Sequence, residues 1–441
     1  MNQLFQKVSS SLKRNPNNIF LILLPFLLLY GILVISGMKE GLRKDEWRYV
    51  YYAHQLLKGE YSPPGTVFLW NGPGYPLFLA PFIAMGFSLG VLKMFNAFFL
   101  YLSLVYFYKS SAYFFPGYIS LVVTALLGAY WPAYEMLSYL MTESFMIFLI
   151  TLLLWFCIRL YMSSNPSSLY MMLLAGSLAL AALTKVIFGY VLLAMILIMS
   201  VWLLIKRNSK LVTAVKVIVL SLVFCWPYLI YTYTISGKLF YWSNAGGMQL
   251  YWMSTPYKGE FGDWINFTYP VSKHEEVNKI FRSRHGKIIN ELFDYPDLFE
   301  KLGQEDLIAR SNIYQDEGFR KYAWANIKSD PGKFLNNWVA NVSRMLFDIP
   351  YSYKTQNYKF LKYIIPHIPL LAALLLGFAI LVSARPKLPF PIIFLMIFTV
   401  VYLGGSSLLS AYPRQFYITI PILTFWIAMT LAPVMKTRKV Q

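Results

Sequence analysis

Ten apolar stretches, each about as long as a membrane-crossing helix, constrain this chain more than any other feature. A helix of about 20 apolar residues spans the hydrocarbon core of a bilayer. Because 57% of the residues are hydrophobic and only 13% are charged, the composition excludes a soluble enzyme with one large core. The sequence predicts an all-α polytopic membrane protein with about ten transmembrane helices, at residues 18–37, 88–108, 112–131, 140–160, 169–185, 187–205, 211–235, 361–382, 388–408 and 415–434.

The acidic and basic residues behind the net charge of +19 are divided between the two sides of this predicted membrane protein. With a cytoplasmic N-terminus, the segments on the inner side contain no acid, and all 20 acids fall on or next to the outer side. Such an asymmetry is the positive-inside rule. We therefore expect both termini in the cytoplasm, contact with anionic membrane lipids and no nucleic-acid partner. The inner bases are Lys7, Lys13, Arg14, Lys109, Arg159, Lys206, Arg207, Lys210, Lys216, Arg385, Lys387, Lys436, Arg438 and Lys439.

Two segments on the predicted outer side are more than connectors. Residues 38–87 follow a first span that we expect to be retained, since no cleavage pattern follows it. Within them, 46–58 has the periodicity of a helix lying in the interface, and 75–87 is apolar but short for a span. Residues 236–360 have nearly balanced charge, as soluble protein does. We expect a transmembrane module (1–235), a mostly helical extracytoplasmic lobe (236–360) and C-terminal transmembrane helices (361–441), with lobe helices near 296–310 and 317–329 and a helix stop and restart at Ser329-Asp330-Pro331.

The acid pair Asp45-Glu46, directly after the first span, offers the clearest chemistry. Asp45 precedes a helical pattern, so it could be a helix N-cap or a proton acceptor. Adjacent helical residues project about 100° apart, so the two carboxylates cannot face each other as a nucleophile and acid pair. One could act as a base while the other positions substrate or a divalent metal ion. Arg48, one turn from Asp45, could bind a phosphate or reach the interface as a surface arginine.

A few other charges lie among or beside the spans. Arg414 begins the last span, where it would contact a lipid phosphate or pair with Glu135 or Glu143. Lys185 is either a second phosphate contact or a loop lysine. For Glu135 and Glu143 structural hydrogen bonding is the default and a share in the active site the alternative. Lys93 is interpreted as a lysine at the membrane boundary. The aromatic residues from Tyr228 to Trp252 form either an interfacial belt or a wall on which a sugar stacks.

The chain resembles the glycosyltransferase C superfamily, whose members use polyprenyl-phosphate-linked sugars and include protein O-mannosyltransferases and aminoarabinose transferases. Five short motifs occur in the same order and at matching topological positions. They are Asp45-Glu46-x-Arg48-Tyr49, Asn71-Gly-Pro-Gly-Tyr75-Pro76, Met141-Thr142-Glu143, Trp226-Pro227-Tyr228 followed by Ser236-Gly237-Lys238 and Gly246-Gly247, and Tyr412-Pro413-Arg414 with Pro421 beyond. Where the aminoarabinose branch has Glu-Lys-Pro, this chain has Asn71-Gly72-Pro73, so that branch's sugar specificity is not implied.

The resemblance implies a membrane glycosyltransferase whose first outer loop, 38–87, is catalytic. Asp45 would be the base, with Glu46 as its helper, in an inverting single displacement onto an acceptor hydroxyl of a lipid, glycan or protein. Arg48, Arg414 and Lys185 would bind the donor's lipid phosphate. The pocket would include Tyr49, Tyr75, Glu143, Tyr228 and Tyr412. No cofactor is required, and a divalent metal ion, if one binds, would be held by Asp45 and Glu46.

Two other classes of function compete with this interpretation. A lipid-linked-sugar flippase or transporter would be expected to have charged or broken helices near the midplane and an internal repeat, whereas the acids here gather at the outer rim. A non-enzymatic membrane scaffold would explain the lobe but not Asp45-Glu46 or Arg414. We expect a multi-pass protein of the bacterial inner or plasma membrane with an extracytoplasmic active site.

Overall fold

The computed structural model describes residues 15, 17–163, 167–265, 271–293, 304–354, 356 and 358–437, and its regular structure there is entirely helical. The expected inner bases Lys7, Lys13, Arg14, Arg438 and Lys439 lie outside the described residues. The same holds for the part of the expected helix 296–310 that precedes residue 304.

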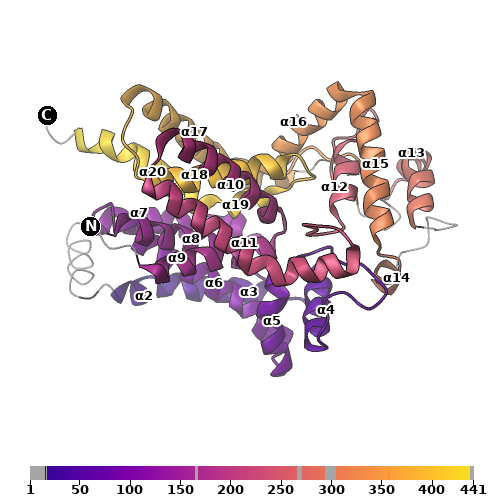
Figure 1. The fold of residues 1–441 in the computed structure, drawn as a ribbon, viewed down its shortest axis with the longest axis horizontal. Helices are drawn as coiled ribbons and strands as arrows, with labels where there is room; N and C mark the ends of the chain where they lie inside the picture. The colour runs from indigo at the N-terminus through magenta and orange to yellow at the C-terminus, as the bar shows by residue number, and fades with distance from the viewer. Residues whose placement is uncertain are drawn as a thin grey trace.

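A bundle of apolar helices makes up most of the molecule (Figure 1). Six described helices are long and apolar enough to cross a membrane, and shorter apolar helices accompany them, so the chain is a multi-pass membrane protein. The long helices are α6 (Leu89–Ser111), α8 (Glu143–Met162), α10 (Ile187–Lys206), α11 (Ser209–Ser236), α17 (Leu361–Ala384) and α18 (Phe390–Ser407). The shorter ones are α2 (Asn18–Ile22), α3 (Leu24–Gly37), α5 (Gly74–Ala84), α7 (Gly117–Gly128), α9 (Ser168–Thr184) and α20 (Ile420–Thr437), of which α20 is described with its side chains only to residue 431.

Each of the ten predicted stretches contains a helix, but three of them are shortened or divided beside a proline. The stretch 18–37 is divided at Leu23 into α2 and α3, and Pro25 lies in the first turn of α3. The stretch 112–131 forms α7 only from Gly117, because Pro116 occupies the N-cap with extended backbone. The stretch 415–434 is divided into α19 (Pro413–Tyr417) and α20, which has Pro421 in its first turn. Of the roughly ten predicted spans, six are therefore confirmed as described helices that are long and apolar enough to cross a membrane.

A second group of helices forms a lobe at one end of the bundle (Figure 1). It comprises α12 (Gly246–Met253), α13 (Glu275–Phe293), α14 (Gln304–Ala309), α15 (Ile313–Ser329) and α16 (Pro331–Phe347). The lobe has its own small core around Trp252, Phe281 and Phe319. At Gly247, α12 approaches α15 so closely that a Cβ atom would lie 1.9 Å from the Asp316 carbonyl oxygen. The predicted stop and restart is confirmed, because Asp330 ends α15 and its carboxylate accepts the Lys333 N–H at 2.8 Å as the N-cap of α16.

The segment between α3 and α6 contains the expected helix, α4 (Glu46–Leu57), and the short apolar helix α5. The buried face of α4 is made by Glu46, Tyr49, Tyr52 and Ala53. The opposite side of the helix, made by Trp47, Val50, Tyr51, His54 and Leu57, is half-buried to exposed. Trp47, Val50, Tyr51 and Leu56 pack against the rim of the core, while the polar and aromatic side chains of the buried face fill the central contact with the bundle.

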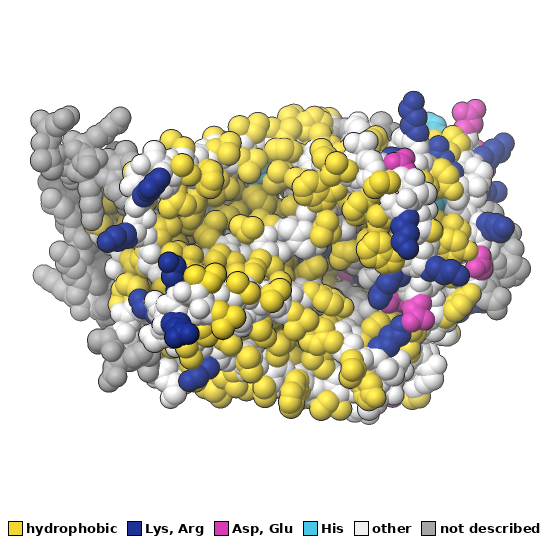
Figure 2. All heavy atoms as spheres, turned by 45° about the horizontal axis from the view of Figure 1, so that its top comes forward, with side chains coloured by type: hydrophobic (Ala, Val, Ile, Leu, Met, Phe, Trp, Pro, Cys, Tyr) yellow, Lys and Arg dark blue, Asp and Glu magenta, His cyan; other side chains and the backbone are white. Residues whose placement is uncertain are grey.

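Charge is distributed unevenly over the surface. Figure 2 shows Lys and Arg side chains without Asp or Glu at the end of the bundle remote from the lobe, on the face in view. Both signs of charge occur together on the lobe, and the hydrophobic surface between them covers the bundle. The distribution agrees with two polar ends separated by a lipid-facing belt.

Candidate functional site

The carboxylate of Asp45 lies at the centre of a group of charged side chains at the lobe end of the bundle. Its Oδ1 is 2.6 Å from Arg48 Nη2, and its Oδ2 is 3.5 Å from Arg414 Nη1. Its side chain does not cap α4, although it stands at the N-cap position. Burial by itself would raise the pKa of Asp45, but Arg48 and Arg414 outweigh it and leave the pKa below its usual range. Asp45 is therefore ionised at neutral pH.

Arg48 is held by the loop that follows α4. Its Nε donates to Asn71 Oδ1 at 2.9 Å, and its guanidinium lies over the rings of Trp47 and Trp70. Asn71 also donates to the Tyr49 hydroxyl at 3.2 Å. These contacts fix the guanidinium plane, so Arg48 is not the freely exposed arginine that the surface interpretation requires.

Two glycines bring this loop against the end of α9. A Cβ atom at Gly72 would lie 2.0 Å from the Leu183 carbonyl oxygen, and one at Gly74 would lie 2.5 Å from Thr184 Oγ1. Only glycine permits this approach. The contact places Asn71 beside the segment that carries Lys185.

Lys185 stands between α9 and α10 and pairs with Glu143, the first residue of α8, at 3.1 Å. The charges of Lys185 and Arg414 both act on Asp45, so the two ion pairs belong to one electrostatic group. Glu143 is buried, and its second oxygen, Oε2, has no hydrogen-bond partner among the described residues. The group formed by Asp45, Arg48, Glu143, Lys185 and Arg414, here called the charged cluster, has three cations against two carboxylates.

Arg414 reaches the charged cluster from a distant part of the chain, through a short segment that the lobe holds in place. The Tyr412 N–H donates to Gln415 Oε1 at 2.7 Å and the Tyr412 hydroxyl donates to the Trp264 carbonyl at 3.1 Å. Just before them, the Ala411 N–H donates to Asn341 Oδ1 at 2.8 Å. The ion pair of Arg414 is with Asp45, and not with Glu135 or Glu143 as the structural alternative proposed.

Asn341 and Arg344, on α16, are structural residues that the sequence did not reveal. Both are fully buried. Arg344 donates to the carbonyls of Ala411, Phe261 and Pro350 at 3.2, 3.1 and 2.9 Å. Together they connect the lobe to the segment before Arg414. Their signal in the sequence was a polar pair at helical spacing, which is equally typical of a solvated helix face.

Glu46 lies apart from the charged cluster. It is 0% exposed, and its carboxylate accepts the backbone N–H groups of Arg43 and Leu140 at 2.6 and 2.7 Å and pairs with Lys93 at 3.2 Å. Both oxygens are thus used within the fold, and the two neighbouring carboxylates have separate partners. Lys93 is correspondingly a buried ion-pair residue and not the boundary lysine that the sequence suggested.

Of the predicted pocket tyrosines, Tyr49, Tyr75 and Tyr228 are buried and Tyr412 is half-buried. Tyr49 and Tyr75 pack edge to face with ring centroids 5.4 Å apart, and Asn71 connects Tyr49 to Arg48. Tyr228 donates to the Trp242 carbonyl at 2.8 Å and packs edge to face against Tyr61 with ring centroids 6.0 Å apart. The contacts of Tyr228 are those of a packing residue. Glu135 pairs with Lys362 at 2.8 Å, apart from Asp45.

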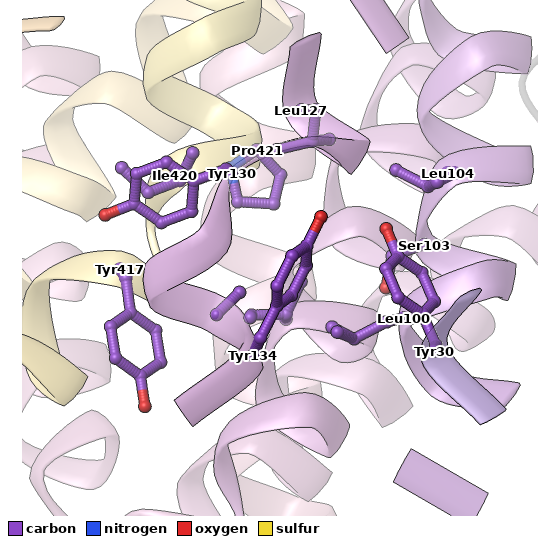
Figure 3. Close-up of a pocket in the computed structure, with 12 residues that line it drawn as sticks. Tyr30, Leu100, Ser103, Leu104, Leu127, Tyr130, Tyr134, Tyr417, Ile420 and Pro421 are labelled. Atoms are coloured by element: carbon purple, nitrogen blue, oxygen red, sulfur yellow. The ribbon is translucent and has the colours of Figure 1, made fainter. Parts of the chain in front are cut away.

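A small cavity lies within the bundle (Figure 3). Tyr417, one turn beyond Arg414, and Ile147, one turn beyond Glu143, both line it. The other lining residues are Tyr30, Leu100, Ser103, Leu104, Leu127, Tyr130, Ala133, Tyr134, Ile420 and Pro421. In Figure 3 the Tyr417 ring stands at one side, with its hydroxyl directed away from the Leu127 end.

A divalent metal ion would need several ligands that converge. Within the part of the chain that the structure describes, no group of three or more His, Cys, Asp or Glu side chains is arranged to hold one. Asp45 and Glu46 do not converge either, since Glu46 is committed to Lys93 and two backbone N–H groups.

Comparisons with known proteins add little to this geometry. No protein-family model matches the chain, and no curated protein matches it significantly. Among solved structures, it is similar to ArnT from Cupriavidus metallidurans in the apo state and bound to undecaprenyl phosphate, with TM-scores of 0.40 and 0.41. Both share 13% identity with this chain, and each match covers 94% of this chain and 79% of the other. A likeness this distant carries no argument about function, which therefore depends on the site itself.

Proposed function

We propose that this protein transfers a monosaccharide from a polyprenyl-phosphate donor to an acceptor hydroxyl on the extracytoplasmic side of the membrane. The observation that carries the proposal is the charged cluster. Segments that are distant in the sequence bring an ionised carboxylate, Asp45, together with the cations Arg48, Lys185 and Arg414 at one end of a membrane bundle. A base beside a phosphate-sized group of cations is what transfer from a lipid-linked sugar needs. The order of the five sequence motifs supports the same activity.

The proposed reaction is a single displacement with inversion at the sugar's anomeric carbon. The acceptor oxygen forms the new bond to that carbon while its proton passes to the Asp45 carboxylate. The bond from the anomeric carbon to the phosphate oxygen breaks, and the electron pair leaves with the polyprenyl phosphate. Arg48, Arg414 and Lys185 stabilise this leaving group. When the phosphate engages the arginines, the Asp45 carboxylate is released from them to meet the acceptor.

The proposal assigns the two neighbouring acids different roles. Asp45 is the base, since its carboxylate is partly exposed and ionised within the charged cluster. Glu46 supports the loop from inside the fold and does not contact substrate. The three cations supply the charge that a metal ion would otherwise provide, so activity in the presence of a chelator is expected.

The alternative is a flippase or transporter of lipid-linked sugars. The charged cluster could bind the phosphate of such a lipid without breaking any bond. A carboxylate held beside the phosphate site favours the transferase, because a binding site for an anion gains nothing from a negative charge.

The experiment that tests the proposal is the substitution Asp45→Asn. The amide keeps the size of the side chain and removes the base, so transfer should fall by about two to four orders of magnitude. Sugar transfer and undecaprenyl phosphate binding are measured on the purified protein. Loss of transfer with retained lipid binding is expected. Near-normal transfer by Asp45→Asn would show that Asp45 is not the base.

A further inference from the structure

Several buried polar groups without a partner lie beside the charged cluster, and the proposed mechanism does not use them. Glu143 Oε2 and the hydroxyl of Tyr417 have no hydrogen-bond partner among the described residues, and both side chains are 1% exposed. The hydroxyl of Tyr402, on α18, is also buried without a hydrogen bond of standard geometry, although the Ser406 side chain lies close to it. Buried hydroxyls and carboxylates are nearly always hydrogen-bonded, so unpartnered ones indicate a missing ligand or water.

The three groups belong to one place in the fold. Glu143 exerts the largest charge effect on the phenols of both Tyr402 and Tyr417. Tyr402 stacks on Phe188, with centroids 4.3 Å apart, and Phe188 follows Lys185 by one turn. Lys185 in turn pairs with Glu143. Tyr417 and Ile147 line the same cavity, and Ile147 lies one turn beyond Glu143 on the same face of α8.

We infer that Glu143, Tyr402 and Tyr417 form a subsite for the hydroxyl groups of a neutral sugar on the lipid-linked donor. This inference rests on the proposed function. A sugar hydroxyl can donate to Glu143 Oε2 and exchange hydrogen bonds with the two phenols. Arg414, one turn before Tyr417, and Lys185, the partner of Glu143, place the phosphate end of the donor next to this subsite. An aliphatic lipid tail would leave the polar groups unsatisfied.

The charge of the subsite selects among sugars. Glu143 is neutralised by Lys185, and Arg414 stands nearby as a further cation. An amino sugar, which carries a positive charge, would meet an environment that is already neutral to positive. A hydroxyl-bearing hexose or pentose without an amine is therefore the chemical class that fits.

The test measures how much the sugar adds to lipid binding. Purified protein in detergent is titrated with undecaprenyl phosphate alone and with undecaprenyl phosphate carrying glucose, galactose, mannose or 4-amino-4-deoxyarabinose. The variants Tyr417→Phe and Tyr402→Phe each remove one hydroxyl and keep the ring. Tyr161→Phe is the matched control, because its hydroxyl is also buried without a partner but lies near the other end of α8.

For at least one neutral sugar, we expect tighter binding to the native protein than undecaprenyl phosphate alone shows. Tyr417→Phe and Tyr402→Phe should each reduce that gain about five- to tenfold, with binding of the bare lipid unchanged, and Tyr161→Phe should leave the gain intact. An undiminished gain in both variants, no gain with any neutral sugar, or a gain confined to the amino sugar would each overturn the subsite. Failure of bare undecaprenyl phosphate to bind the native protein would instead count against the proposed function.

Discussion

Asp45 and Glu46 show how two adjacent residues of the same type acquire different roles. Asp45 faces two arginines at the surface of the charged cluster, whereas Glu46 turns into the fold and meets Lys93 and two backbone N–H groups. The 100° between successive helical residues is enough to separate the two environments. Helix geometry predicted from the sequence that the two carboxylates could not face each other as a nucleophile and acid pair. It could not say which acid would be buried, because Lys93 and Leu140 are brought to Glu46 only by the tertiary fold.

A stability measurement tests this division of roles at the residue scale. Glu46→Gln leaves the Lys93 ammonium buried without a counter-charge, and breaking a buried ion pair in this way costs about 3–5 kcal/mol. We expect a marked fall in melting temperature in detergent. The double variant Glu46→Gln with Lys93→Met removes both charges and should regain a large part of the loss. A melting temperature for Glu46→Gln equal to that of the native protein would contradict the structural role.

At the scale of elements, the lobe depends on a buried network around Glu260, between α12 and α13. The Glu260 carboxylate accepts from Arg284 Nη1 at 2.9 Å and lies 3.1 Å from His285 Nε2. The hydroxyls of Thr255 and Tyr353 also donate to it. Although burial alone would raise the pKa of Glu260, the hydrogen bonds and charge of His285 and the two hydroxyls lower it to about 2.

This lowered pKa predicts how the stability of the lobe depends on pH. The ordinary Glu pKa is 4.5. The stabilisation from Glu260 is thus fully present above pH 4.5, and it is lost as the pH falls from 4.5 toward 2, to a total of about 3 kcal/mol. Hydrogen exchange of α12 and α13 should accelerate over this acid range. In Glu260→Gln, the exchange should already be faster at neutral pH and respond less to acid. An identical acid response in both proteins would argue against this network.

Sequence periodicity was sufficient to locate the helices that face lipid or solvent. The apolar lengths located the bundle helices, and Ser329-Asp330-Pro331 located the junction of α15 and α16. The pattern was insufficient where polar residues are buried. Asn341 and Arg344 occupy positions that resemble an exposed face, yet they hold the segment that delivers Arg414. Such contacts join residues about 70 positions apart, and local sequence does not specify them.

At the scale of the whole molecule, the fold brings distant segments of the chain to one end of the bundle. Asp45 and Arg48 come from the start of α4, Glu143 and Lys185 from the ends of α8 and α9, and Arg414 from α19. The sequence could nominate these residues only by motif and by their position beside apolar stretches. Their meeting is the strongest sign that this end of the bundle is where chemistry occurs.

The most direct test of the central claim asks whether a bond in the lipid-linked donor is broken. The native protein is reconstituted in liposomes with undecaprenyl-phosphate-linked hexoses labelled in the sugar, with envelope extract as the source of acceptors. We expect free undecaprenyl phosphate to be released in an amount equal to that of the sugar that reaches an acceptor. Movement of the labelled lipid between the two leaflets with its sugar–phosphate bond intact would contradict the account.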